Sequence, residues 1–119
     1  MSSFDPMAAA IDWLDAYRAA SLSIVDFYAP NGALECSCGG EKVLYGRAAH
    51  ESYWRQRFKE MPAGALADLQ MEGEDIVLAY EVPGGISQAV LHHDQDGKIS
   101  LSRCGPALPV GQVMSCAAA

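Results

Sequence analysis

Apolar residues in the first half of the chain recur with the three- and four-residue spacing of amphipathic helices. Asp5 and Pro6 form a helix start, with Asp5 as the capping residue, and the stripe that follows predicts a helix to about residue 20. Ser21 can cap a second, short helix, and a third helix is expected at 47–60, where Pro62 ends it. The residues that share an apolar side are Ala10, Trp13, Leu14, Tyr17 and Ala20 in the first helix, Leu22, Val25 and Tyr28 in the second, and His50, Trp54 and Phe58 in the third.

Beyond Gly64 the pattern changes to segments typical of β-strands, separated by short turns. A shorter hairpin around Gly39 and Gly40 precedes the third helix, and a turn at 30–32 separates this hairpin from the second helix. The sequence therefore predicts an α+β domain with a mostly antiparallel sheet. The expected strands are 33–38, 42–45, 65–73, 75–82, 86–93 and 99–104.

The turns between the last three strands decide which side chains share a face of the sheet, because side chains alternate along a strand. One face is expected to bury against the helices. The other is so apolar that we expect a second copy of the chain to cover it, in a homodimer that buries at least about 1,200 Å². The inward set is Ile76, Leu78, Tyr80, Val82, Ser87, Ala89, Leu91, His93, Ser100, Ser102 and Cys104. The outward set is Val77, Ala79, Ile86, Val90, Ile99 and Leu101, interleaved with Glu81, Gln88, His92 and Arg103, and an ion pair between Glu81 and Arg103 is plausible there.

The composition is that of a folded, acidic domain. Half of the residues are hydrophobic and 19% are charged, which excludes intrinsic disorder. The formal net charge of −7, from 15 acidic and 8 basic side chains, disfavours nucleic acids and anionic membrane surfaces as partners. No stretch is apolar over the roughly 18 residues of a membrane span, and residues 1–10 do not resemble an export signal, so we expect a cytoplasmic protein. One domain is expected at 1–106, followed by a weakly patterned tail at 107–119.

The four cysteines allow three interpretations. In a chain without an export signal, reduced thiols are the default, and such thiols fill the core or line a pocket. A redox pair is the second interpretation, and a metal site built from Cys36, Cys38, Cys104 and His93 is the third; Cys116 lies in the expected tail. Zinc sites usually contain two close pairs of ligands and this chain has only one, of the form C-x-C, so we expect no metal and no cofactor.

Two segments carry a resemblance to a known fold. The first, 26–35 (DFYAPNGALE), leads from a helix into a strand, and the second, 45–49 (YGRAA), places a glycine before the third helix. Together with the turn at 96–99 and the order of elements over 7–105, they make the chain similar to the nuclear transport factor 2-like superfamily, in its SnoaL-like and ketosteroid isomerase-like branch. The resemblance implies a cone-shaped, curved antiparallel sheet with three N-terminal helices packed on its concave face.

The resemblance to the isomerases implies a pocket that lacks their catalytic residues. The oxyanion-hole tyrosine of that family falls on Trp13, its general-base aspartate on Cys36, and its protonated aspartic acid on Ala89. The isomerase mechanism needs a carboxylate to move the proton and two donors to hold the enolate oxygen. None of the three roles is filled by a matching side chain, so we expect no steroid isomerase activity.

The inward side chains predict a pocket for a small hydrophobic or aromatic molecule, although an aromatic stripe at helical spacing is also typical of a core. His93 could act as a general acid or base, and Tyr17 and Cys36 are the other candidate catalytic residues. We expect a SnoaL-like pocket protein, and one interpretation is a cofactor-free isomerase, cyclase or hydratase. The alternative is a non-catalytic dimer that binds a ligand or a partner protein. The pocket candidates are Trp13, Tyr28, Cys38, Trp54, Phe58, Tyr80, Ala89, Leu91, Ser102 and Cys104.

Overall fold

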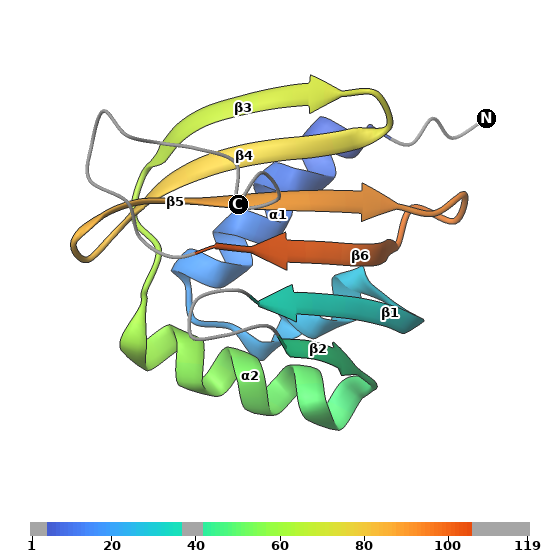
Figure 1. Cartoon of the computed structure of the whole chain (residues 1–119), viewed down its shortest axis with the longest axis horizontal. Helices are drawn as coiled ribbons and strands as arrows, with labels where there is room; N and C mark the ends of the chain where they lie inside the picture. Colours follow the sequence, from blue (N-terminus) through green and yellow to red (C-terminus); the bar gives the residue numbers. More distant parts are fainter. Residues whose placement is uncertain (1–4, 37–41, 106–119) are drawn as a thin grey trace.

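Helical segments and a six-stranded sheet form two layers, which confirms the expected α+β class (Figure 1). The structure is a computed structural model and describes residues 5–36 and 42–105, so the expected break at 39–40 and the tail at 107–119 lie outside the described residues. The helical segments are α1 (Pro6–Arg18), the 3₁₀ helix η1 (Leu22–Phe27) and α2 (Arg47–Glu60). The strands are β1 (Tyr28–Cys36), β2 (Lys42–Tyr45), β3 (Leu66–Glu72), β4 (Asp75–Val82), β5 (Gly85–His93) and β6 (Ile99–Cys104).

Local sequence explains where the first helices begin. Asp5 Oδ1 accepts a hydrogen bond from the backbone N–H of Met7 at 3.0 Å, and Pro6 occupies a position in the first turn where no backbone donor is needed. Ser21 caps η1 in the same way, through the N–H of Ser23. Over the described ranges, no helix combines the length and the apolar character needed to cross a membrane.

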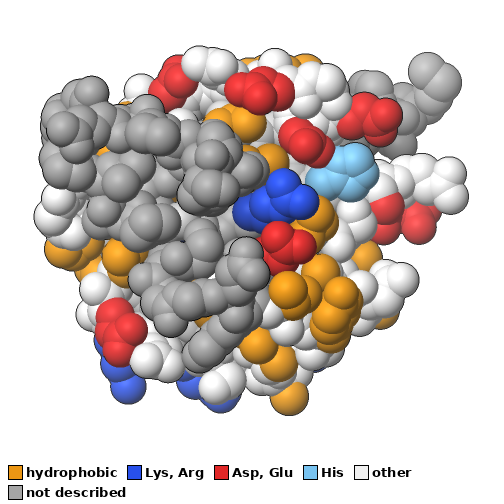
Figure 2. Space-filling view, viewed as in Figure 1, with side chains coloured by type: hydrophobic (Ala, Val, Ile, Leu, Met, Phe, Trp, Pro, Cys, Tyr) orange, Lys and Arg blue, Asp and Glu red, His pale blue; other side chains and the backbone are white. Residues whose placement is uncertain are grey.

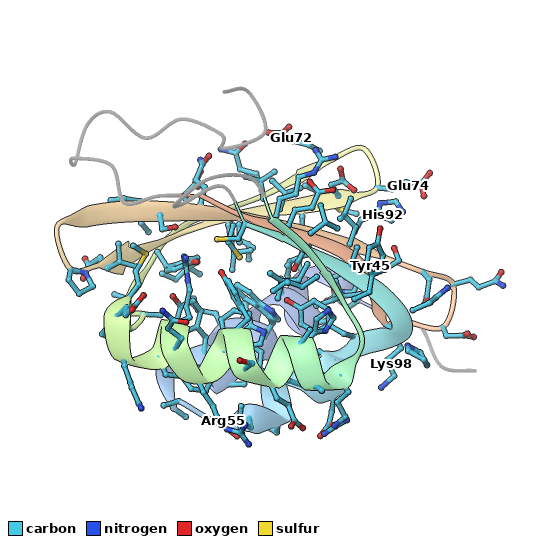
Figure 3. The ribbon with its side chains drawn as sticks, turned by 60° about the horizontal axis from the view of Figure 1, so that its bottom comes forward. Tyr45, Arg55, Glu72, Glu74, His92 and Lys98 are labelled. Atoms are coloured by element: carbon cyan, nitrogen blue, oxygen red, sulfur yellow. The ribbon has the colours of Figure 1, made fainter. Side chains whose placement is uncertain are left out.

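The strands are ordered β2-β1-β6-β5-β4-β3 across the sheet. Every neighbouring pair is antiparallel except β1 and β6, which run parallel and place their C-terminal ends side by side. α1 contacts β3 and β4, and α2 contacts β2 and η1. Figure 3 shows the sheet curving over α2, with a layer of side chains between them. The cone therefore has an interior bounded by the sheet on one side and the helices on the other.

The segment 30–32, where we expected a turn, is part of β1. Tyr28 pairs with Ile99 and Ala33 pairs with Leu101, so β1 advances five residues while β6 advances two. Gly32 lies inside this irregular stretch, and a Cβ atom placed on it would approach the carbonyl oxygen of Ile99 to 2.6 Å. The chain bulges here instead of turning, because β1 can pass so close to β6 only where a residue has no side chain.

The hairpin between β4 and β5 has the expected register, but the predicted outward position of Ile99 is wrong. His92 pairs with Leu101 and His93 pairs with Ile99, so β6 carries one extra residue between these two pairs. The extra residue is Ser100, whose hydroxyl donates a hydrogen bond to the carbonyl oxygen of His92 at 3.1 Å. The bulge turns Ile99 into the core, where it is 1% exposed, and removes Ser100 from the inward row.

Aromatic rings fill the centre of the cone. Trp13, Tyr17, Trp54 and Tyr80 are each at most 1% exposed. Trp13 and Tyr17 each lie against the other three rings, mostly edge to face, with centroid separations between 4.9 and 6.2 Å. Such pairs stabilise a core beyond the apolar area that they bury. At the centre of the cone, the apolar sides of the helices therefore form a packed core.

Replacing Gly32 with alanine should destabilise the protein, because the new methyl group has no space between β1 and β6. We expect the free energy of unfolding to fall by about 1–3 kcal/mol, as for other overpacked sites. Urea denaturation followed by circular dichroism measures this change. Gly73→Asn is the matched control, since Gly73 has φ 62° and open space around it, and asparagine tolerates that conformation. Equal stability of both variants would contradict the proposed close approach.

Candidate active site

One face of α2 carries a charged residue into the cone. His50, Trp54 and Arg57 follow one another at i, i+4 and i+7, and all three are buried, Arg57 with 6% of its surface exposed. Phe58, which we predicted for this face, is partly buried beside it. Arg55, two residues before Arg57, points away from the sheet into solvent (Figure 3). The helical repeat therefore places one guanidinium inside the cone.

Hydroxyl groups from the facing elements surround the guanidinium of Arg57. Its Nε donates to Tyr17 Oη at 2.8 Å, and its Nη2 lies 3.3 Å from Tyr80 Oη and 3.4 Å from Ser87 Oγ. Tyr17 and Ser87 in turn donate to the backbone carbonyl groups of Met61 and Gly105. Arginine keeps its charge in proteins, and a hydrogen bond from a charged donor is stronger than one between neutral groups. This network joins α1, α2, β4 and β5.

Tyr53 points its hydroxyl into the same region, and that oxygen is buried without a hydrogen-bond partner. The phenol interacts electrostatically with Cys104, Arg57, Cys36 and Tyr80, and the Arg57 guanidinium lies 6.0 Å from the centre of the Tyr53 ring. A buried donor without an acceptor costs about 1–3 kcal/mol. We call the polar group formed by Tyr17, Tyr53, Arg57, Tyr80 and Ser87 the Arg57 site.

Two thiols border the Arg57 site. Cys36 in β1 is the register partner of Cys104 in the parallel strand β6. Cys104 is also the register partner of Ala89 in the antiparallel strand β5. The first and last strands are thus neighbours, which a metal site built from these cysteines would require. Cys38 lies outside the described residues. Within those residues, no group of three His, Cys, Asp or Glu side chains could hold a metal ion.

A second chain of polar groups starts at Trp13, a member of the aromatic cluster. Trp13 Nε1 donates to Tyr28 Oη at 3.3 Å, and Tyr28 Oη shares a hydrogen bond of 2.8 Å with Ser102 Oγ. His50, which we predicted on the apolar side of the third helix, is 2% exposed, and its Nε2 donates to the carbonyl oxygen of Leu44 at 3.1 Å. Each of these buried side chains has a hydrogen-bond partner, and together they belong to the core.

The structure brings together two of the three predicted catalytic residues. Tyr17 belongs to the Arg57 site, and Cys36 borders it through Cys104. His93 is half-buried at the far end of β5, four residues from Ala89, which corresponds to about 13 Å along a strand. Burial lowers the pKa of His93, and neighbouring His92 lowers it further. His93 is therefore placed apart from the other two, and all three catalytic roles stay predictions.

The predicted pocket residues of the sheet lie on the interior side. Ala89, Leu91, Ser102 and Cys104 are each at most 1% exposed, and Tyr28 is 6% exposed. Like the aromatic rings beside them, they belong to the packed interior of the cone. That they line a ligand cavity stays a prediction.

The buried side chains of the described ranges include no carboxylate. Glu35 faces outward and accepts a hydrogen bond from Arg103 Nε at 3.1 Å. The ion pair expected between Glu81 and Arg103, on the face where two copies would meet, stays a prediction. On the same face, His92 Nδ1 donates to Asp75 Oδ1 at 2.6 Å. Because the carboxylates pair on the outer surface, the interior offers donors and thiols rather than a carboxylate base.

Burial keeps the interior phenols protonated. It raises the pKa of Tyr17 to about 12, against the opposing effect of the Arg57 charge. Burial likewise raises the pKa values of Tyr28, Tyr53 and Tyr80 above the usual value for tyrosine. At neutral pH these groups are hydrogen-bond donors, and none is a ready proton acceptor.

Comparison with known proteins identifies the fold of the chain but assigns no activity to it. The chain matches no protein-family model, and no curated protein matches it. It is similar to a SnoaL-like protein of unknown function from Burkholderia thailandensis, with 18% identity and a TM-score of 0.70 over 80% of this chain and 88% of that one. It is also similar to an uncharacterized cystatin-fold protein from Novosphingobium aromaticivorans, with 18% identity and a TM-score of 0.68 over 86% and 98% of the two chains. The chain has a SnoaL-like fold of the nuclear transport factor 2-like type, as the sequence predicted.

Arg57 and Tyr53 are the functional candidates that the sequence interpretation missed. We expected Phe58, at i+4 from Trp54, on the inward side of the third helix and assigned no role to Arg57, at i+3. The usable signal was the spacing itself, since position 57 continues the stripe of His50 and Trp54. A chain with few inward polar groups but several inward tyrosines has hydroxyls available to surround such a charge.

Alkaline pH should destabilise the protein through these tyrosines. A phenol whose pKa is raised by folding holds its proton to higher pH than it does in the unfolded chain, so the free energy of unfolding falls as pH rises from about 10 to about 12. For Tyr17 the loss reaches about 2.7 kcal/mol. Tyrosinate absorbance and circular dichroism, measured together, should show the buried phenols ionising only as the protein unfolds. Ionisation of all five tyrosines at about pH 10 in a folded protein would contradict this.

Proposed function

We propose that the protein binds a small aromatic or hydrophobic compound that carries an oxygen acceptor, and that the Arg57 site holds this oxygen. The observation that carries the proposal is the buried, unpartnered hydroxyl of Tyr53. Folded proteins pair nearly all buried donors, and an exception points to a ligand or a water that completes the pair. A carbonyl or carboxylate oxygen of a ligand would accept this hydrogen bond.

The surroundings of Tyr53 favour an aromatic ligand. Trp54 and Phe58 lie on the same helix, and the Trp54 ring stands edge to face with Tyr53, with centroids 5.2 Å apart. Cys36 and Phe58 are partly buried, so this region is nearer to solvent than the closed centre of the cone. Apolar walls with few polar groups at one end are typical of small-molecule sites. The Arg57 guanidinium beside them supplies a charged group that attracts an electron-rich oxygen.

A catalytic role is a direct extension of this binding mode. Donors that hold a carbonyl oxygen also stabilise the negative charge that develops on it during proton transfer or addition. Cofactor-free isomerisation, cyclisation or hydration of the bound compound would use the Arg57 site as the oxyanion-stabilising group. Cys36, next to Cys104, is then the candidate proton carrier, and Tyr17 acts through its hydrogen bond with Arg57.

Tyr53→Phe separates ligand binding from stability. Removing an unpaired buried hydroxyl should leave the free energy of unfolding unchanged or raise it, whereas loss of the hydrogen bond should weaken a ligand about fivefold. Quenching of Trp13 and Trp54 fluorescence measures binding of benzoate, acetophenone and the hydrocarbon ethylbenzene. We expect the variant to lose affinity for the two oxygen-containing compounds and to bind ethylbenzene unchanged.

Tyr45→Phe is the matched control, because Tyr45 is 64% exposed on β2 and lies outside the cone. It should bind all three compounds as the wild-type protein does. Wild-type protein that shows no saturable quenching by any of them, or a Tyr53→Phe variant with unchanged affinities, would contradict the proposal.

The outer face of the sheet supports a second proposal, that two copies of the chain pair through it. Val43 and Tyr45 on β2 are 48% and 64% exposed, and a hollow of about 220 Å³ lies farther along the face, lined in part by Val90 and Leu101. Figure 2 shows hydrophobic side chains on this face beside a group of charged ones. Apolar surface next to polar groups that fix the register is suited to a two-fold, self-complementary contact.

Val90→Lys tests the pairing. The substitution would bury a charge without a partner at the centre of the proposed contact, so we expect a monomer where the wild-type protein is a dimer. Light scattering at micromolar concentration measures the mass, and circular dichroism checks that the variant is folded. Ser52→Lys, on the exposed side of α2, is the control and should stay dimeric. A monomeric wild-type protein would overturn this second proposal and leave the ligand proposal standing.

A further inference from the structure

Cys36 and Cys104 lie directly beside each other where β1 and β6 end. They are partners in the parallel register of these strands, and both pack against the interior of the cone. Neighbouring strands are about 4.8 Å apart, and a disulfide joins Cα atoms that are about 4.4–6.8 Å apart. Both side chains are thiols in this structure. The strand register therefore places the two Cα atoms within the range that a disulfide spans.

The two thiols differ in their exposure to solvent and in the charges beside them, which suits them to different steps. Cys36 is partly exposed, so a small oxidant can reach it, whereas Cys104 is 1% exposed. The guanidinium of Arg57 interacts electrostatically with Cys104, and a neighbouring cation favours the thiolate, which is the form that attacks another sulfur. Redox-responsive pairs consist of an accessible thiol and a neighbouring second thiol that reacts with it after oxidation.

We propose that Cys36 and Cys104 form a reversible disulfide when the protein meets a hydroperoxide. The Cys36 thiolate attacks the terminal peroxide oxygen, the O–O bond breaks, and the leaving alkoxide takes up a proton to become an alcohol. Cys36 is then a sulfenic acid. The Cys104 thiolate attacks the Cys36 sulfur, the S–O bond breaks, and the departing hydroxide takes up a proton to become water. Two thiols lose two electrons and two protons, and the peroxide gains both.

The disulfide would connect the first and the last strand of the fold. It would close a loop of more than sixty residues, and a cross-link of that length strongly restricts the unfolded chain. The melting temperature of the oxidised protein should therefore exceed that of the reduced protein by several degrees. A thiol reductant should reverse the change. The proposal does not depend on the ligand that the Arg57 site binds.

The test uses the full chain with Cys38→Ser and Cys116→Ser, so that two cysteines remain. The protein is treated with one equivalent of hydrogen peroxide, alkylated with iodoacetamide and digested with trypsin. Cleavage after Arg18, Lys42 and Arg103 leaves peptides 19–42 and 104–119, with one cysteine each. We expect mass spectrometry to find these peptides linked within a single chain, and to find both alkylated after dithiothreitol treatment.

The same chain with Cys104→Ala is the control and should accumulate sulfenic or sulfinic acid at Cys36 without any rise in melting temperature. Full alkylation of both cysteines after peroxide would overturn the proposal, and so would a link between two molecules. In the chain with all four cysteines, a dominant link from Cys36 to Cys38 would overturn it as well. If the double variant does not fold, the linked peptides are sought in the wild-type digest, with Cys36→Ala as the control.

Discussion

The buried guanidinium of Arg57 is the interaction on which the interior of the cone depends. A charge removed from water has to be surrounded by polar atoms, so the neighbouring elements must supply hydrogen-bonding groups. α1 supplies Tyr17, β4 supplies Tyr80 and β5 supplies Ser87, so one side chain of α2 ties the helices to the sheet. Tyr17 and Ser87 pass hydrogen bonds on to backbone carbonyl groups. One polar network thus orients an otherwise aromatic core, and side chains in such networks depend on one another for their placement.

The parallel pairing of β1 with β6 is the second constraint. It makes neighbours of two strands that are far apart in the sequence, and it brings Cys36 beside Cys104 at the edge of the Arg57 site. It also requires the close approach of β1 to β6 at Gly32. The covalent chemistry proposed for the thiols and the backbone geometry of β1 therefore have the same origin.

The chemistry of the interior differs from that of the isomerases that the chain resembles. Trp13, Cys36 and Ala89 belong to the interior, yet the buried side chains of residues 5–36 and 42–105 include no carboxylate. Phenols, thiols and a guanidinium hold an oxygen better than they abstract a proton. For this reason the proposed function is built on recognition of an acceptor oxygen, and catalysis is an extension of it.

The sequence by itself determined most of the elements, because capping residues and hydrophobic periodicity act locally, but not the part of β1 at 30–32. Asp5, Pro6 and Ser21 marked the helix starts, and the strand bounds of β2, β4 and β6 followed from alternation and turns. Only the tertiary structure decided what the interior contains. Whether Arg57 points inward depends on hydroxyls that three distant segments bring to it, and the inward turn of Ile99 depends on one extra residue in β6. The helical spacing places Arg57 on the inward stripe of α2, but it does not supply the hydroxyl partners that a buried charge needs. Those partners, like the extra residue in β6, take effect only after the sheet has paired and the helices have packed on it.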